Sequence, residues 1–156
     1  MLACRALSVN LVEVDAPEMI ALVLERGIGV EAGLWSVEDA ERFVKLDTAP
    51  KCLRILIEIN EQDETEGLAV AAGIRTVLAR ASLDVPVLQH GYDASVWPLY
   101  RDALMRGLDG RIGLEDGRHL PDGEIAAGNA DLIKAAFLMA RVPPNLAPEA
   151  TPAPPG

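Results

Sequence analysis

The sequence predicts an α/β fold with a parallel sheet, as part of a (β/α)8 TIM barrel of about five β/α units. Strand-like apolar runs alternate with helical segments five times along the 156-residue chain, a pattern typical of parallel strands joined by crossover helices. Polar residues also recur at or near the expected carboxyl ends of the strands, at intervals of 21, 27, 32 and 25 residues. A complete barrel averages about 31 residues per unit and carries its active site at those strand ends. The recurring polar residues are Asn10, Glu31, Glu58, His90 and Glu115.

The expected strands are short runs rich in Val, Ile and Leu. The run over residues 52–59 is the strongest, because its nearly continuous Leu and Ile indicate a strand covered on both faces. Pro86 interrupts a later strand near its start. In chain order the expected strands cover residues 6–14, 28–32, 52–59, 85–90 and 111–116.

The segments between and after these strands have the apolar spacing and the end signals of helices. Pro17 suits a first helical turn, and Gly27 ends that helix. Ser36 can cap the next helix, with Asp39 three residues later forming a capping box. The acidic stretch 61–66 is expected to be a loop or a first turn. The expected helices cover residues 17–26, 37–45, 67–81, from Asp93 or Ser95 to 106, and from a capping Asn129 to about 141.

One folded domain is expected over residues 1–141, followed by a disordered tail over residues 142–156. Six of the chain's eleven prolines fall in those last fifteen residues, and Pro-rich segments of this kind behave as extended linkers. Half of all residues are apolar, but Trp, Tyr and Phe number only two each. The core must therefore come mainly from Leu, Val, Ile and Ala.

The net charge of −10 argues against nucleic acid or an anionic membrane as a partner, because both bind basic surfaces. No apolar run reaches the roughly 20 residues of a membrane span, and the first fourteen residues lack the apolar segment of a secretory signal. Cys4 and Cys52 lie too far apart to form a metal motif, so we expect two free thiols in a reducing compartment. The sequence therefore predicts a cytoplasmic protein.

The hexapeptide Arg111-Ile112-Gly113-Leu114-Glu115-Asp116 is the most informative motif. In a strand, its two apolar side chains point one way, and Arg111 and Glu115 point the other. Burying an Arg and a Glu on one face is costly unless these charges pair or take part in chemistry. An edge strand with one solvated face is the alternative interpretation.

The hexapeptide, followed by Leu120-Pro121-Asp122-Gly123 and Asn129-Ala130-Asp131-Leu132, resembles the end of the β-keto acid cleavage enzymes, the 3-keto-5-aminohexanoate cleavage family. The segments Val30-Glu31-Ala32-Gly33-Leu34-Trp35 and Ser8-Val9-Asn10 fall where that family has its middle strands. The resemblance covers roughly residues 6–140. It implies a (β/α)8 barrel that binds a divalent metal, usually zinc, and that converts a β-keto acid and acetyl-CoA into a new CoA thioester and acetoacetate.

The resemblance also implies roles for single residues. Glu115 corresponds to a metal ligand, and Asp116 to the base that deprotonates the substrate. Arg111 corresponds to the group that holds and tunes this base. Such a division is chemically reasonable, since zinc polarises a keto oxygen and an Asp beside an Arg stays ionised.

Further residues of this sequence correspond to the family's substrate contacts. Glu31 is expected to face the barrel mouth and to contact the variable part of the substrate. Ser8 and Asn10 are expected to form hydrogen bonds with its reacting oxygens.

The chain departs from the family in its histidines. The family's other metal ligands are a His-x-His pair on an early strand, and this sequence contains only His90 and His119. His90 ends an expected strand and could reach the site, whereas His119 is expected in a surface loop. Glu115 alone cannot hold a catalytic zinc, which takes three protein ligands, so we expect this chain alone to bind metal weakly or not at all.

The simplest interpretation is that the chain corresponds to strands four to eight of the family's barrel. The first and last of its strands would then be open sheet edges, which proteins normally cover. Pairing of these edges in a homo-oligomer, or a partner chain carrying the missing units, would cover them.

Three other interpretations stay open. The chain could be a non-catalytic α/β remnant or binding module without the metal site. It could also be an unrelated metal-free α/β enzyme using His90 and Glu58, although no nucleophile-elbow signature accompanies them. A doubly wound open sheet is the alternative fold, although no Gly-x-Gly-x-x-Gly motif follows any expected strand.

Overall fold

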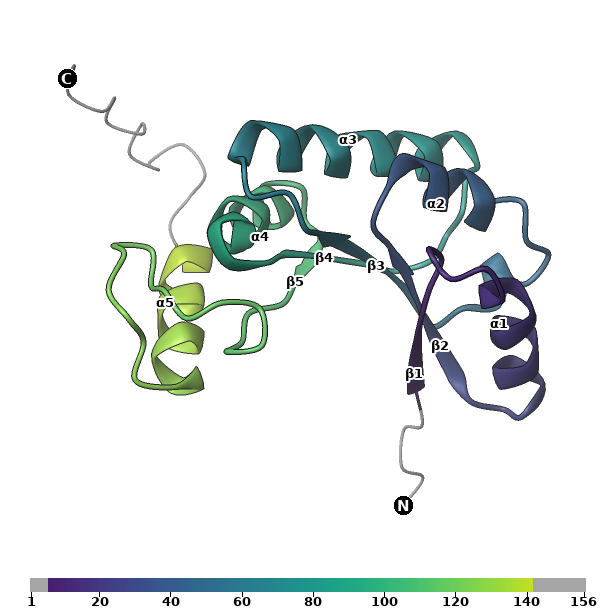
Figure 1. Cartoon of the computed structure of the whole chain (residues 1–156), viewed down its shortest axis with the longest axis horizontal. Coiled ribbons are helices and arrows are strands. Elements are labelled where there is room, and N and C mark those ends of the chain that lie inside the picture. The colour runs from purple at the N-terminus through teal and green to yellow at the C-terminus, as the bar shows by residue number, and fades with distance from the viewer. Residues whose placement is uncertain (1–5, 142–156) are drawn as a thin grey trace.

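The computed structural model describes residues 6–141, and in this range five parallel strands form one sheet. The strands lie side by side in chain order (Figure 1). A doubly wound sheet reverses its strand order at a switch point, so the alternative fold is wrong, whereas the predicted α/β fold with a parallel sheet is confirmed. The strands are β1 (Ala6–Asn10), β2 (Gly29–Leu34), β3 (Arg54–Ile59), β4 (Val87–Gly91) and β5 (Asp109–Gly110).

Helices follow the strands at the predicted places, with shifted ends. The capping box at Ser36 is confirmed, because its hydroxyl accepts from the Asp39 amide while the Asp39 carboxylate accepts from the Ser36 amide. The third helix begins earlier than predicted, since Asp63 caps it by accepting from the Glu66 amide at 2.9 Å. The helices are α1 (Ala16–Glu25), α2 (Val37–Phe43), α3 (Glu64–Arg80), α4 (Val96–Met105) and α5 (Asn129–Arg141), with short 3-10 turns at Ala49–Lys51 and Asp93–Ser95.

The two faces of the sheet differ in chemistry because side chains alternate along each strand. One face is largely apolar and packs against α1, α2, α3 and α4 in a single cluster (Figure 1), although the buried Gln89 of β4 also lies on it. Strand residues in this cluster are Val9, Val30, Ala32, Leu34, Ile55, Ile57 and Ile59. The other face carries polar residues that face one another across the strand pairs, and these are Ser8, Glu31, Arg54, Glu58 and His90.

The first strand is shorter than the predicted 6–14. It stops at Asn10, whose carbonyl accepts from the Glu13 amide at 3.1 Å and so closes a turn. The Arg42 guanidinium from α2 donates to the carbonyls of Leu11 and Glu13. This side chain from a later helix stabilises the turn, and a local sequence pattern does not reveal it.

The predicted tail over 142–156 and Cys4 lie outside the described residues. Cys52 is a free, buried cysteine, and burial raises the pKa of its thiol to about 11. Its thiol therefore stays protonated and unreactive at neutral pH. Among the helices of residues 6–141, none is long and apolar enough to cross a membrane.

Replacing Ser36 by Ala removes the side-chain oxygen that caps α2. We expect the free energy of unfolding to fall by about 0.5–2 kcal/mol, the usual effect of losing such a cap. Urea unfolding followed by circular dichroism measures this change. The control is Thr76→Ala, which removes a hydroxyl from an exposed position inside α3 and should change stability little. Equal stability of Ser36→Ala and the native chain would contradict the prediction.

Candidate active site

The hexapeptide 111–116 forms a turn directly after β5. The amides of Asp116 and Gly117 both donate to the carbonyl of Gly113, at 2.9 and 3.1 Å. The predicted strand over 111–116 is therefore wrong, and only Asp109 and Gly110 pair with β4. An extended strand would separate Arg111 from Asp116 by about 16 Å. The turn instead lets the Arg111 guanidinium bind both oxygens of the Asp116 carboxylate, with Nε 3.2 Å from Oδ2.

Two hydrogen bonds and one apolar contact hold this turn in place. The Asp116 carbonyl accepts from the Asp93 amide at 2.7 Å, and the Leu114 amide donates to Oδ1 of Asn129 at 2.8 Å. The predicted capping role of Asn129 is wrong, because α5 begins at Asn129 itself and its side chain bonds the turn instead. Ile112 packs against the apolar cluster between α4 and α5.

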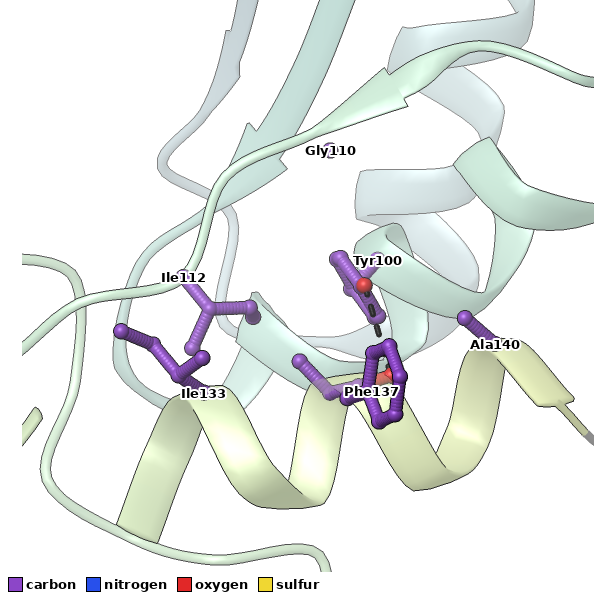
Figure 2. A pocket seen from close by; sticks show the side chains of 7 residues that line it. Tyr100, Gly110, Ile112, Ile133, Phe137 and Ala140 are labelled. Atoms are coloured by element: carbon purple, nitrogen blue, oxygen red, sulfur yellow. Dashed lines mark hydrogen bonds between the residues drawn. The ribbon is translucent and has the colours of Figure 1, made fainter. Parts of the chain in front are cut away.

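A hollow of about 280 Å³ lies between α4 and α5, beside the start of the hexapeptide (Figure 2). The Tyr100 hydroxyl in it donates to the carbonyl of Ala136 at 3.4 Å. Among the described residues no charged side chain lines this hollow, so its walls offer no acid or base. The lining residues are Tyr100, Gly110, Ile112, Ile133, Ala136, Phe137 and Ala140.

His90 lies between two carboxylates on the polar face of the sheet. Its Nε2 is 3.4 Å from Oε1 of Glu58, and its Nδ1 is 3.4 Å from Oδ1 of Asp116. His90 is 0% exposed, Asp116 1% and Glu58 6%. Within residues 6–141 neither ring nitrogen has a hydrogen-bond partner, so the polar contacts of the imidazole are these two ionic contacts.

The remaining contacts of this cluster come from Trp35 and Arg111. Trp35 follows β2, and its indole Nε1 donates to Oε2 of Glu58 at 2.6 Å. Glu58 and His90 are paired directly in the register of β3 and β4. Residues 35, 58, 90, 111 and 116 therefore form one connected polar cluster, which we call the His90 cluster.

The pKa values in the His90 cluster favour charged side chains. Burial lowers the pKa of His90, but the carboxylates of Asp116 and Glu58 raise it by more, so the net shift is upward. Burial raises the pKa of Glu58, but His90 and Trp35 lower it by more, so the net shift is downward. The pKa of Asp116 is likewise lowered, because His90 and Arg111 outweigh the effect of burial. These shifts favour anionic Glu58 and Asp116 and a cationic His90 beside Arg111.

Glu31 does not join this cluster. It lies in the middle of β2 and is paired with Arg54, the first residue of β3, whereas Glu58 lies near the end of β3. The expectation that Glu31 shares one end of the sheet with Glu58 and His90 is therefore wrong. Its Oε2 accepts from the Ser8 hydroxyl at 3.2 Å, and its Oε1 accepts from Nε of Arg54 at 2.6 Å.

Two predicted site residues, Asn10 and Glu115, and the second histidine, His119, lie in three different settings. Asn10 ends β1, and its Oδ1 is buried without a hydrogen-bond partner among the described residues. The Glu115 side chain is 72% exposed and lies 3.4 Å from the Arg111 guanidinium. His119 is an exposed loop residue that forms an isolated bridge with Ile125, in accord with the predicted surface position.

The donor set does not fit a metal ion within this part of the chain. Among residues 6–141 no group of three or more His, Cys, Asp or Glu side chains is placed to hold one. Both nitrogens of His90 face carboxylates, and the exposed Glu115 belongs to no such group. A catalytic zinc takes three protein ligands, so these residues do not form such a site by themselves.

Comparison with known families identifies the chain. A family model described as beta-keto acid cleavage enzyme matches residues 15–143. The chain belongs to the beta-keto acid cleavage enzyme family. The match includes the complete hexapeptide and the segments that carry Trp35, Glu58 and His90. A comparison with curated proteins finds no match.

Sequence reasoning singled out Arg111, Asp116, Glu58 and His90, but it did not identify Trp35 as a partner of Glu58. The available signal was its position, since Trp35 directly follows the end of β2 and Glu58 lies near the end of the neighbouring β3. An indole N–H is a donor only, and a carboxylate on the neighbouring strand is its natural acceptor.

The upward shift of the His90 pKa predicts how stability depends on pH. The stabilisation from the charged imidazole is complete below its unfolded pKa of about 6.5 and is lost as the pH rises through the higher folded pKa. We expect the unfolding free energy of the native chain to decline relative to that of His90→Gln as the pH rises above about 6.5. Urea titrations at several pH values measure this difference. If the unfolding free energy of the native chain instead rises with pH relative to that of His90→Gln, the folded protein holds His90 neutral.

Proposed function

We propose that this chain carries the acid–base machinery of a β-keto acid cleavage reaction, with Asp116 as the base. The observation that carries the proposal is the buried pair of Asp116 and Arg111 in the turn after β5. A general base must be ionised at the working pH and must be held in a defined direction. Arg111 meets both needs, because it lowers the Asp116 pKa and contacts both carboxylate oxygens.

The proposed substrates are a β-keto acid and acetyl-CoA, and the products are a new CoA thioester and acetoacetate. Asp116 would accept a proton from the carbon between the keto and carboxylate groups, which is acidic because both groups stabilise the resulting carbanion. Asp116 is 1% exposed, while the Arg111 side chain is 33% exposed. Arg111 must therefore shift when a substrate approaches, and the substrate carboxylate is a suitable new partner for its guanidinium.

Ser8, Asn10 and Glu31 are the proposed substrate contacts on the polar face. Ser8 and Glu31 already bond to each other, and Glu31 also pairs with Arg54. Asn10 differs because its buried side-chain oxygen lacks a partner within residues 6–141. That oxygen lies against Gly33 of β2, so the side chain would have to rotate to form a hydrogen bond with a substrate.

We propose that the sheet is part of a (β/α)8 barrel whose polar face is the barrel interior. Consecutive parallel strands with helices on one face are how such a barrel is built. Within residues 6–141, β1 and β5 are the edges of the sheet, and a further strand beside each would pair with its outer backbone groups. A zinc ion at Glu115 would need two more donors from outside residues 6–141 or from another chain.

A second copy of the chain is the proposed source of additional strands. Several large apolar side chains of α5 are exposed, which are Ile133 at 58%, Phe137 at 55% and Leu138 at 55%. An apolar face of this kind is typical of an interface. A homo-oligomer would cover this face together with the open sheet edges.

Asp116→Asn keeps the shape of the side chain and removes its basicity. We expect kcat to fall by about 10²–10⁴-fold, the usual contribution of a positioned base. The assay is the keto-acid-dependent formation of acetoacetate from acetyl-CoA, with the chain in its native assembly. The control is Glu124→Gln, an exposed carboxylate later in the same loop, which should keep full turnover.

Near-native turnover of Asp116→Asn would remove the proposed role of the hexapeptide. A native assembly without any turnover would favour the non-catalytic binding module instead.

Phe137→Glu tests the proposed homo-oligomer. We expect the native chain to sediment as a dimer or larger species, and the charge to weaken association by about tenfold or more, because burial of a Phe side chain contributes about 1.5–3 kcal/mol. Sedimentation velocity over a range of concentrations measures this. Met105→Glu is the control, since Met105 is 57% exposed at the end of α4. A native chain that stays monomeric would exclude self-association and leave a different partner chain.

A further inference from the structure

We propose that His90 is a positioning residue, which bridges Glu58 and Asp116 as an imidazolium and fixes the Asp116 carboxylate in place. Only the role of Asp116 as a base is taken from the proposed function. The bridge itself follows from the positions of the side chains and can be tested without any activity.

The protonation state follows from the two contacts of the imidazole. Its two nitrogens each lie 3.4 Å from a carboxylate oxygen, one of Glu58 and one of Asp116. A neutral imidazole carries an N–H on one nitrogen only, so the lone pair of its other nitrogen would face a carboxylate across this distance. Only the doubly protonated ring carries an N–H on both nitrogens, so only that form is attracted to both carboxylates. Because His90 is 0% exposed, solvent does not relieve the mismatch of a neutral ring.

The charge balance supports the same state. The groups that face the ring are Glu58 from β3, Asp116 and Arg111 from the hexapeptide, and Tyr92 just after β4. Two buried carboxylates beside one guanidinium would leave a net negative charge in a buried site, which is costly. A cationic His90 brings the cluster to neutrality.

The surroundings fix the orientation of the ring. The Tyr92 ring lies edge-on to it, with centroids 5.2 Å apart and an interplanar angle of 71°. The indole of Trp35 holds Glu58 from the other side. Gly91 lets the chain turn tightly after His90, since a Cβ at that position would lie 2.6 Å from the carbonyl oxygen of Ser95.

The contacts of Asp116 show why a second cation is needed. His90 and Arg111 both approach Oδ1, whereas the polar contact of Oδ2 within residues 6–141 is with Arg111, at 3.2 Å. When Arg111 shifts toward a substrate, His90 still holds Oδ1 and keeps the carboxylate ionised. Oδ2 is then the oxygen left free to accept a proton.

The first test is an NMR measurement of the two histidine imidazoles in the full chain labelled with ¹⁵N. His119→Gln removes the exposed second imidazole and so assigns the His90 signals. We expect both His90 nitrogens to carry protons at neutral pH. Asp116→Asn and Glu58→Gln should each lower the pH at which the second proton is lost, because each removes a neighbouring negative charge.

Glu64→Gln is the control for these two variants, since Glu64 is an exposed carboxylate at the start of α3 and should leave the His90 titration unchanged. A His90 with one unprotonated nitrogen at neutral pH in the native chain would overturn the inference. Because this measurement uses the native chain, it does not depend on whether the variants fold.

The second test is the pH profile of turnover. We expect His90→Gln to lower kcat by about 10²-fold, a typical effect of misplacing a catalytic group, with a smaller change in KM. Turnover of the native protein should decline at the pH where NMR shows His90 losing its second proton, and His90→Gln should lack this decline. An unchanged kcat in His90→Gln would overturn the positioning role.

The two tests separate this inference from the proposed function. A doubly protonated His90 in a protein without turnover would support the bridge and refute the cleavage activity. A neutral His90 in an active protein would refute the bridge alone.

Discussion

The ionic contacts of His90 with Glu58 and Asp116 connect parts of the chain that are distant in sequence. They join the ends of two neighbouring strands to the hexapeptide turn, and Trp35 adds the end of a third strand. None of these charged groups would be stable alone in a buried site. Each is stabilised by the next, so the geometry of Asp116 depends on the register of β3 and β4 as much as on its own turn.

The fold could be predicted largely from the sequence because its signals are local. The apolar run of β3, the capping box at Ser36 and the alternation of strands with helices all act within a few residues. The errors came from side-chain contacts that an apolar-polar pattern does not reveal. β1 ends early because Arg42 binds the turn after it, and residues 111–116 form a turn because Arg111 binds Asp116. An apolar-polar alternation predicts a strand only where no such pair competes with it.

The site was predicted in part. The motif and the family resemblance gave Arg111 and Asp116, and the position at a strand end drew attention to His90 and Glu58. The pairing of Glu31 with Arg54 could not be predicted, since strand register determines it and the sequence alone does not fix register. The same holds for the contact of Asn129 with Leu114, which joins the start of a helix to a turn 15 residues earlier.

The order of the strands has a consequence for how the protein folds. Each strand pairs with the next one in the chain, so paired residues such as Ser8 and Glu31, or Leu88 and Asp109, are only 23 and 21 residues apart. Parallel pairing is otherwise slow, because distant segments must meet before their contacts form. Here each new unit can add to the edge left by the one before it, much as successive repeats stack in a solenoid. Folding intermediates would then be shorter versions of the same sheet.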